Sequence, residues 1–125
     1  MTLTVTKVFD HDCPICSFMA SFDGKVLFDL KPAVTMKAIE LGRLIDPDNE
    51  NAFECILAQY VERHAVNDDY TLDLPVYMVT QGKTYLGHTK GELSQSELRS
   101  KLEEIIADAS DPKSESGAGE GWDVL

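Results

Sequence analysis

The sequence has few of the features that mark membrane, nucleic-acid-binding or secreted proteins. It contains no apolar run that approaches the ~20 residues of a membrane-spanning helix. Lys and Arg number 11 against 22 Asp and Glu, and the formal net charge of −11 predicts repulsion from nucleic acid phosphates and anionic lipid heads. Three cysteines are too few, and odd in number, for a disulfide framework. Because residues 1–10 also lack the apolar middle of a secretory signal, we expect a cytoplasmic protein that binds neither nucleic acid nor membranes.

One folded domain and a tail account for the chain. Its 125 residues are enough for a single core and too few for two ordinary domains. We predict the domain over residues 1–108. Residues 109–125 are rich in Ser, Gly and acidic side chains and have little to bury before Trp122 and Leu125, so we expect an acidic, disordered tail. The functional alternative is a docking peptide with Trp122 and Leu125 as its anchors.

Hydrophobic periodicity predicts elements in the order β-α-β-α-β-β-α. The first two strands are joined by a helix and should be parallel, whereas the last two form a hairpin and should be antiparallel. The first helix is expected to bend near Gly24, and Ser94 with Glu97 forms a capping box that opens the last helix. The predicted fold is therefore an α/β fold with a mixed sheet of about four strands. Its strands are predicted at 3–9, 33–41, 76–80 and 84–88, and its helices at 14–30, 50–65 and 96–107.

Two thiols lie three positions apart in the segment CPIC, at the predicted junction of the first strand and the first helix. The unpaired N–H groups and partial positive charge of a helix N-terminus stabilise a thiolate at Cys13. Pro14 suits the first helical position, where its missing N–H costs nothing. The spacing lets Cys16 fold back onto Cys13, so that Cys16 can resolve a mixed disulfide formed by Cys13. The pair is thus predicted to open and close.

Two other interpretations of the thiol pair stay open at this point. The first is a pair of inert, buried thiols. The second is a metal site, although the chain has no second C-x-x-C and no H-x-x-x-H motif to complete a structural zinc site. Elsewhere, Cys55 is expected to be exposed, His64 to lie in the core or an interface, and His88 to lie on the surface. The side chains that a metal site would draw on are His11, Cys13, Cys16, Cys55, His64 and His88.

Over residues 3–107 the chain resembles thioredoxins. The resemblance rests on the order of the elements, on CPIC, on DLPVYMVTQGK and on GELSQSEL. In that family a cis-proline, here Pro75, opens the third strand, and a glycine, here Gly91, lies beside the active site. The resemblance implies a thioredoxin-like fold and a thiol–disulfide oxidoreductase that reduces protein disulfides. It also implies no bound cofactor and a separate electron donor that resembles thioredoxin reductase. A monomer is the default expectation for the oligomeric state.

The resemblance assigns a role to each residue near the pair. Cys13 would be the attacking thiolate and Cys16 the resolving thiol. The backbone of Leu74 would pair with the bound substrate as an added strand. A glutaredoxin-like reaction with glutathione is less expected, because no Gly-Gly-Asp signature follows the hairpin. The implied substrate-binding residues are Pro14, Ile15, Leu74, Pro75 and Gly91.

The residues around the pair depart from the thioredoxin pattern. Asp12 stands where thioredoxins usually carry Trp, and Lys7 stands where they bury an acid that helps to deprotonate the second thiol. A nearby Lys7 would favour a thiolate, whereas Asp10 and Asp12 would oppose it. The alternative function is a protein-binding adaptor of the same fold that docks through its acidic surface, the inserted residues 46–74 or the tail. The residues expected to modulate the thiols are Lys7, Asp10, His11 and Asp12.

Overall fold

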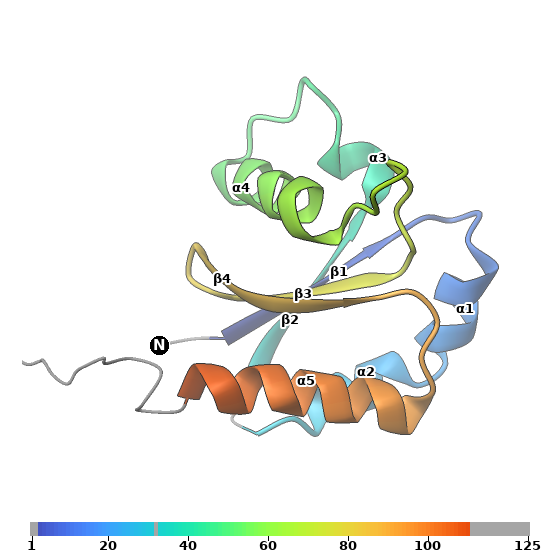
Figure 1. The fold of residues 1–125 in the computed structure, drawn as a ribbon, viewed down its shortest axis with the longest axis vertical. Coiled ribbons are helices and arrows are strands. Elements are labelled where there is room, and N and C mark those ends of the chain that lie inside the picture. The colour runs from blue at the N-terminus through green and yellow to red at the C-terminus, as the bar shows by residue number, and fades with distance from the viewer. Residues whose placement is uncertain (1–2, 32, 111–125) are drawn as a thin grey trace, which may run out of the picture.

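A four-stranded mixed sheet with helices on both faces forms the fold of residues 3–31 and 33–110, which the computed structural model describes (Figure 1). In chain order the elements are β1 (Leu3–Phe9), α1 (Pro14–Ala20), α2 (Asp23–Phe28), β2 (Val34–Glu40), α3 (Leu41–Leu44), α4 (Ala52–Tyr60), the π-helix η1 (Val61–Ala65), β3 (Val76–Gln81), β4 (Thr84–Lys90) and α5 (Gln95–Ser110). The strand order is β2-β1-β3-β4, with β1 parallel to β2 and antiparallel to β3, and β3 antiparallel to β4. These directions confirm the predicted α/β sheet. Among the described residues, no helix is both long enough and apolar enough to cross a lipid bilayer.

The sheet separates two hydrophobic cores because successive side chains of a strand point to opposite faces. On one face, Val5 and Val79 pack with buried residues of α1, α2 and α5. On the other face, Val8 and Met78 pack with buried residues of α3, α4 and η1. Figure 1 shows the same division, with α2 and α5 on one side of the sheet and α3 and α4 on the other. Both β1 and β3 are therefore covered on both faces.

The strand β2 lies at one edge of the sheet. Within the described part of the chain it pairs only with β1, so its outer side has no strand partner. The side chains of residues 35–38 are exposed. The sheet is consequently well covered at its centre and open along this edge.

The prediction of a single first helix is wrong, because two helices, α1 and α2, occupy that segment. The break falls at Ser21 and Phe22, before Gly24. Ser21 donates a hydrogen bond from its Oγ to the carbonyl oxygen of Phe18 at 2.8 Å, a local bond that competes with continued helix. A second helix then begins at Asp23. Asp23 is therefore the first residue of α2, and from this position its carboxylate contacts Lys7 near the thiols.

The segment after β2 also differs from the prediction. The expected strand at 33–41 ends at Glu40, and the short helix α3 follows it directly. The expected helix at 50–65 begins at Ala52 and changes into the π-helix η1 for its last five residues. Its widened turn closes with a hydrogen bond from the N–H of Val66 to the carbonyl oxygen of Val61 at 3.1 Å. The polar residues between α3 and α4 supply the N-terminal cap of α4.

The last helix begins as predicted and ends later. The N–H of Ser94 donates to the carboxylate of Glu97 at 2.9 Å, and the N–H of Glu97 donates to Oγ of Ser94 at 3.2 Å. These reciprocal bonds confirm the capping box. The helix continues to Ser110, two residues into the predicted tail. The rest of that tail, residues 111–125 with the candidate docking peptide, lies outside the described residues.

Candidate active site

The segment CPIC forms the turn between β1 and α1. Cys13 is the N-cap of α1, and its Sγ accepts a hydrogen bond from the N–H of Cys16 at 3.1 Å. The N–H of Cys13 donates to the carbonyl oxygen of Asp10 at 3.1 Å and closes the preceding loop. Pro14 occupies the first helical position. The structure thus brings the two cysteines together at the predicted strand-to-helix junction, and both are free thiols.

The two thiols differ in their access to solvent. Cys13 is half-buried, whereas Cys16 is only 4% exposed. Burial raises the pKa of the Cys16 thiol to about 11, and its hydrogen bond with Cys13 adds to the shift. Cys16 therefore stays protonated at neutral pH while the pair is reduced. An incoming group reaches Cys13 first.

A buried ion pair lies close to the inner thiol. The ammonium Nζ of Lys7 donates to Oδ2 of Asp23 at 2.6 Å, and the side chains are only 15% and 11% exposed. The hydroxyl of Tyr77 donates to the same carboxylate oxygen at 2.7 Å. Burial and then the carboxylate of Asp23 raise the pKa of Tyr77. Lys7 and Cys16 line one small pocket of about 330 Å³, and the charge of Lys7 favours the Cys16 thiolate, although burial outweighs it.

The acid of this pair could not be identified from the sequence. Lys7 on β1 suggested that the site lacks a buried carboxylate, but α2 supplies one in Asp23. In the sequence, the dipeptide Asp23-Gly24 indicates a bend in the helix or a hairpin turn, and nothing in it indicates a carboxylate near the thiols. Sixteen residues separate Lys7 from Asp23, and fifty-four separate Asp23 from Tyr77. A contact at such separations depends on the tertiary fold, so no local pattern announces it.

An open groove of about 530 Å³ lies in front of Cys13. It brings together four of the residues predicted from the sequence and adds four that the sequence did not indicate. Pro14 is exposed and is not among its lining residues. The predicted residues that line it are Cys13, Ile15, Leu74 and Gly91, and the additional ones are Leu72, Asp73, Lys90 and Glu92.

Pro75 is not among the residues that line the groove, but its neighbour Leu74 and its hydrogen-bond partner Gly91 are. The Leu74–Pro75 peptide bond is cis, and Pro75 is buried. Its carbonyl oxygen accepts a hydrogen bond from the N–H of Gly91 at 3.1 Å. Gly91 has φ +81°, a conformation that favours glycine, and an added Cβ would contact Cβ of Asp73 at 3.4 Å. The inserted residues 46–74 reach this groove through Leu72 and Asp73, which explains why a simple family pattern does not reveal them.

The other residues expected to modulate the thiols lie on the loop before Cys13. His11 is exposed and pairs with the carboxylate of Glu40 at 3.0 Å. The side chain of Asp10 accepts a hydrogen bond from the N–H of Asp12 at 3.1 Å. Both Asp10 and His11 line the small pocket beside Cys16. Acidic side chains therefore stand on the loop that leads to Cys13, with Lys7 as the cation of the same pocket.

The metal-site alternative finds no support in residues 3–31 and 33–110. No group of three or more His, Cys, Asp or Glu side chains in this part of the chain is arranged to hold an ion.

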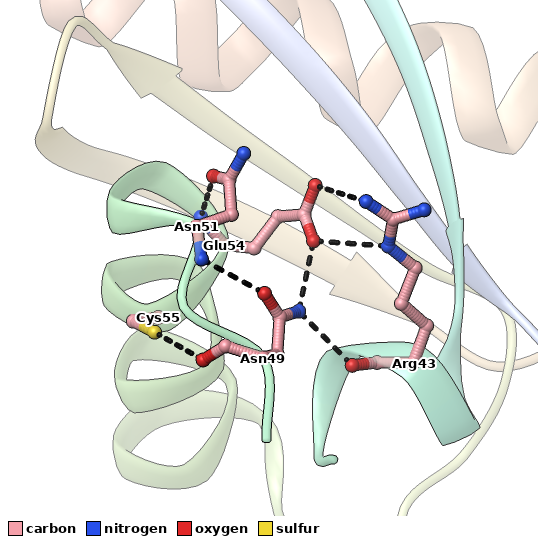
Figure 2. Close-up of polar contacts among 5 residues, drawn as sticks. All are labelled: Arg43, Asn49, Asn51, Glu54 and Cys55. Atoms are coloured by element: carbon pink, nitrogen blue, oxygen red, sulfur yellow. Dashed lines mark hydrogen bonds and ion pairs between the residues drawn. The ribbon is translucent and has the colours of Figure 1, made fainter. Parts of the chain in front are cut away.

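Cys55 is half-buried, not exposed as predicted, and its thiol donates to the carbonyl oxygen of Asn49 at 3.2 Å (Figure 2). Cys55 lines a separate pocket of about 480 Å³.

The two remaining histidines flank Tyr85. His64 was expected in the core or in an interface; it does not lie in the core, because its exposed ring stacks on the ring of Tyr85 with centroids 4.1 Å apart, and the interface position stays a prediction. The hydroxyl of Tyr85 and Nδ1 of His88 are hydrogen-bonded at 2.7 Å. His88 is half-buried rather than a plain surface residue. Burial, followed by the charges of Lys90 and His64, lowers its pKa.

Comparisons with known proteins identify the fold. No protein-family model matches the chain, and no curated protein matches it in sequence. Solved structures do match, among them the periplasmic thioredoxin SoxS from Paracoccus pantotrophus in its reduced form, with a TM-score of 0.59 and 12% identity over 86% of this chain and 99% of that one. The thioredoxin of Fasciola hepatica matches with a TM-score of 0.53 and 18% identity over 83% of this chain and 81% of that one. Chloroplastic thioredoxin z matches with a TM-score of 0.52 and 20% identity over 85% of this chain and 80% of that one.

The strand topology and these matches together define the fold. The order and directions of the strands, with helices on both faces, make this an α/β protein with a mixed central sheet. The fold is the thioredoxin fold, which confirms the fold that the sequence resemblance implied. At identities of 12% to 20% these matches show the fold. The chemistry has to be argued from the residues of this chain.

Proposed function

We propose that the protein is a thiol–disulfide oxidoreductase of the thioredoxin type, which reduces protein disulfides through Cys13 and Cys16. The observation that carries the proposal is the paired geometry of the thiols. Sγ of Cys13 lies 3.1 Å from the N–H of a buried Cys16 and borders an open groove. One sulfur is thus available to a substrate, and the other is held behind it.

The proposed reaction has two thiol–disulfide exchange steps. The thiolate of Cys13 attacks one sulfur of the substrate disulfide, and the other substrate sulfur leaves as a thiolate that takes up a proton. Cys16 then loses its proton and attacks the sulfur of Cys13. This step releases the second substrate thiolate, which is protonated in turn, and leaves a Cys13–Cys16 disulfide. Two electrons have passed from the protein to its substrate.

The second step requires Cys16 to lose a proton despite a pKa of about 11. The charge of Lys7 stabilises the resulting thiolate. We assign the proton to the carboxylate of Asp23, which is paired with Lys7, a lining residue of the small pocket beside Cys16. Lys7 and Tyr77 both donate to Asp23 and hold that carboxylate in place.

The cycle needs an electron donor and a compartment that keeps thiols reduced. A separate protein that resembles thioredoxin reductase would supply two electrons to reopen the Cys13–Cys16 disulfide. We place the cycle in the cytoplasm and take the working unit to be a monomer. Because thiol–disulfide exchange proceeds between sulfurs, the reaction calls for no bound cofactor.

The test is the reduction of insulin disulfides with dithiothreitol as the electron donor. The wild-type protein should accelerate the reduction, and Cys13→Ser should abolish the acceleration. Cys16→Ser, reduced first and then freed of dithiothreitol, should instead accumulate a mixed disulfide with insulin, visible by non-reducing electrophoresis. Cys55→Ser is the matched control, since it removes a thiol outside the pair and should retain full activity. Undiminished activity in Cys13→Ser would overturn the proposal.

A docking role is the second candidate, and exposed hydrophobic side chains favour it. Tyr70 is 91% exposed and has φ +66°, and Ile45 is 64% exposed. Exposed apolar groups of this size often mark interaction sites. The variant with both Cys13→Ser and Cys16→Ser separates the two functions. An adaptor would retain its partner in this variant, whereas an oxidoreductase would lose its activity.

A further inference from the structure

The groove in front of Cys13 has an acidic rim. The carboxylates of Asp73 and Glu92 line it together with Cys13. Both residues are exposed, and Asp12, also exposed, directly precedes Cys13. Asp73 has a neutral hydrogen-bond donor, the amide of Asn67 at 3.4 Å, which leaves its charge in place. Two acidic residues therefore line the groove, and a third directly precedes the cysteine whose sulfur meets the substrate.

The one cation that lines the groove is held by its own chain. Nζ of Lys90 donates to the carbonyl oxygen of Ala65 at 2.9 Å and to Oδ1 of Asn67. These bonds fix the ammonium on the side of η1 and the following loop. Lys90 offsets part of the negative charge but has two acceptors of its own. An anionic substrate group would have to compete with both acceptors.

The floor of the groove is apolar. Ile15, Leu72 and Leu74 line it, and each is half-buried. A peptide segment in this groove would place apolar atoms on the floor and its charged side chains toward the rim. Lys and Arg suit that arrangement, because their aliphatic stems cover apolar surface while their charged ends reach carboxylates.

We propose that this groove selects disulfides flanked by Lys or Arg over disulfides flanked by acidic groups. The inference rests on the proposed function and adds a substrate class to it. Opposite charge at a binding cleft raises the rate of encounter by roughly 10- to 1,000-fold, and salt screens the effect. The chemical step is the same exchange at Cys13, so electrons and protons balance as described above. The charge acts on the approach of the substrate.

Three small disulfides test the proposal without a protein partner. Cystamine carries two ammonium groups, 3,3′-dithiodipropionate carries two carboxylates, and 2-hydroxyethyl disulfide is neutral. The rate constant for oxidation of the reduced protein by each is divided by that of dithiothreitol with the same disulfide, which removes intrinsic reactivity. We expect this normalised rate to favour cystamine over dithiodipropionate by about tenfold or more at low ionic strength. The preference should shrink to about twofold in ~0.5 M salt.

Matched variants distinguish the groove from the overall charge of the molecule. The double variant Asp73→Asn with Glu92→Gln should lower the cation preference at least threefold, on the order expected for removing two local charges. The control Glu103→Gln with Glu104→Gln changes the net charge equally on exposed positions of α5. It should leave the preference unchanged. An equal loss in both double variants would show that net charge alone decides, and would overturn the proposal.

The neutral disulfide separates this inference from the proposed function. If the wild-type protein fails to react with 2-hydroxyethyl disulfide, the proposed function itself fails. If that reaction proceeds and cystamine and dithiodipropionate show the ratio seen with dithiothreitol, only the charge selection fails. A cation preference that disappears in the groove variant and persists in the α5 variant supports both.

Discussion

Two ion pairs on opposite faces of the sheet show how differently the same interaction is used. Lys7 and Asp23 are joined at 2.6 Å in the core near the thiols, with 15% and 11% of their side chains exposed. Arg43 and Glu54 are joined at 3.2 Å between α3 and α4, and the Arg43 side chain is 67% exposed (Figure 2). Both members of the first pair are shielded from water, whereas in the second pair only Glu54, at 18% exposed, is shielded and Arg43 is open to solvent.

This difference in burial helps to decide which ion pair serves stability alone and which could serve the proposed thiol chemistry. Burying two charges costs several kcal/mol, and their attraction often does no more than offset that cost. Stability alone therefore gives little reason to retain Lys7 and Asp23, whereas the proposed oxidoreductase would use a charged pair beside Cys16 to move its proton. The exposed pair belongs to a cap, in which Asn49 also donates to Glu54 at 2.8 Å.

The largest effect should follow from removing one member of the buried pair. Lys7→Met leaves the carboxylate of Asp23 buried without its cation, and we expect the free energy of unfolding to fall by about 3–5 kcal/mol. Urea denaturation at pH 7 measures this change. The double variant Lys7→Met with Asp23→Leu removes both charges and should recover part of the loss, because the buried hydroxyl of Tyr77 then lacks its acceptor, and it should release the mixed disulfide slowly. A single-variant loss under about 1 kcal/mol would show that the buried pair resembles the exposed one.

The next effect concerns the third member of the buried group. Tyr77→Phe removes a hydrogen bond to the carboxylate of Asp23 and keeps the ring in the core. We expect a loss of about 1.5–3 kcal/mol, the range for hydrogen bonds to charged groups. Thermal and urea denaturation of this variant provide the measurement. Tyr85→Phe is a suitable control, since its half-buried hydroxyl bonds to the neutral ring of His88 and should contribute less.

A smaller effect is expected from the cap of α4. Oδ1 of Asn51 accepts a hydrogen bond from the N–H of Glu54 at 2.9 Å (Figure 2). Asn51→Ala removes this bond, and the free energy of unfolding should fall by about 1 kcal/mol. Asn51→Ser retains a capping oxygen and should remain close to the wild type. Equal losses in the two variants would mean that the cap itself contributes nothing.

The smallest effect belongs to the exposed ion pair. Arg43→Met should cost about 0.2–1 kcal/mol at low salt, and the difference should vanish at high salt because the pair is screened. The hydrogen bond from Asn49, followed by that from Arg43, lowers the pKa of Glu54 from its ordinary value of 4.5. A lowered carboxylate pKa contributes stability that is complete above pH 4.5 and is lost as the pH falls through the lowered value. The cost of Arg43→Met should therefore diminish in acid, as urea titrations at several pH values would show.

The predictions from sequence succeeded where the cause is local. The capping box at Ser94 and Glu97 and the turn around CPIC each depend on residues within three positions of one another. The helix α3 was missed because Leu41 and Leu44 continue the apolar pattern of the strand before them. The pairing of Lys7 with Asp23 was missed because it depends on how α2 packs under β1. Caps and turns that depend on neighbouring residues can be predicted from a sequence, whereas contacts between distant segments cannot.

The open side of β2 has a consequence for the behaviour of concentrated solutions. Unpaired strand edges act as templates on which other chains can add a strand, and this is a route to self-association. Lys37 stands in the middle of β2, and its ammonium lies 4.6 Å from the centre of the Phe53 ring. A charge at that position makes the edge a poor template. We therefore expect Lys37 to oppose self-association along this edge.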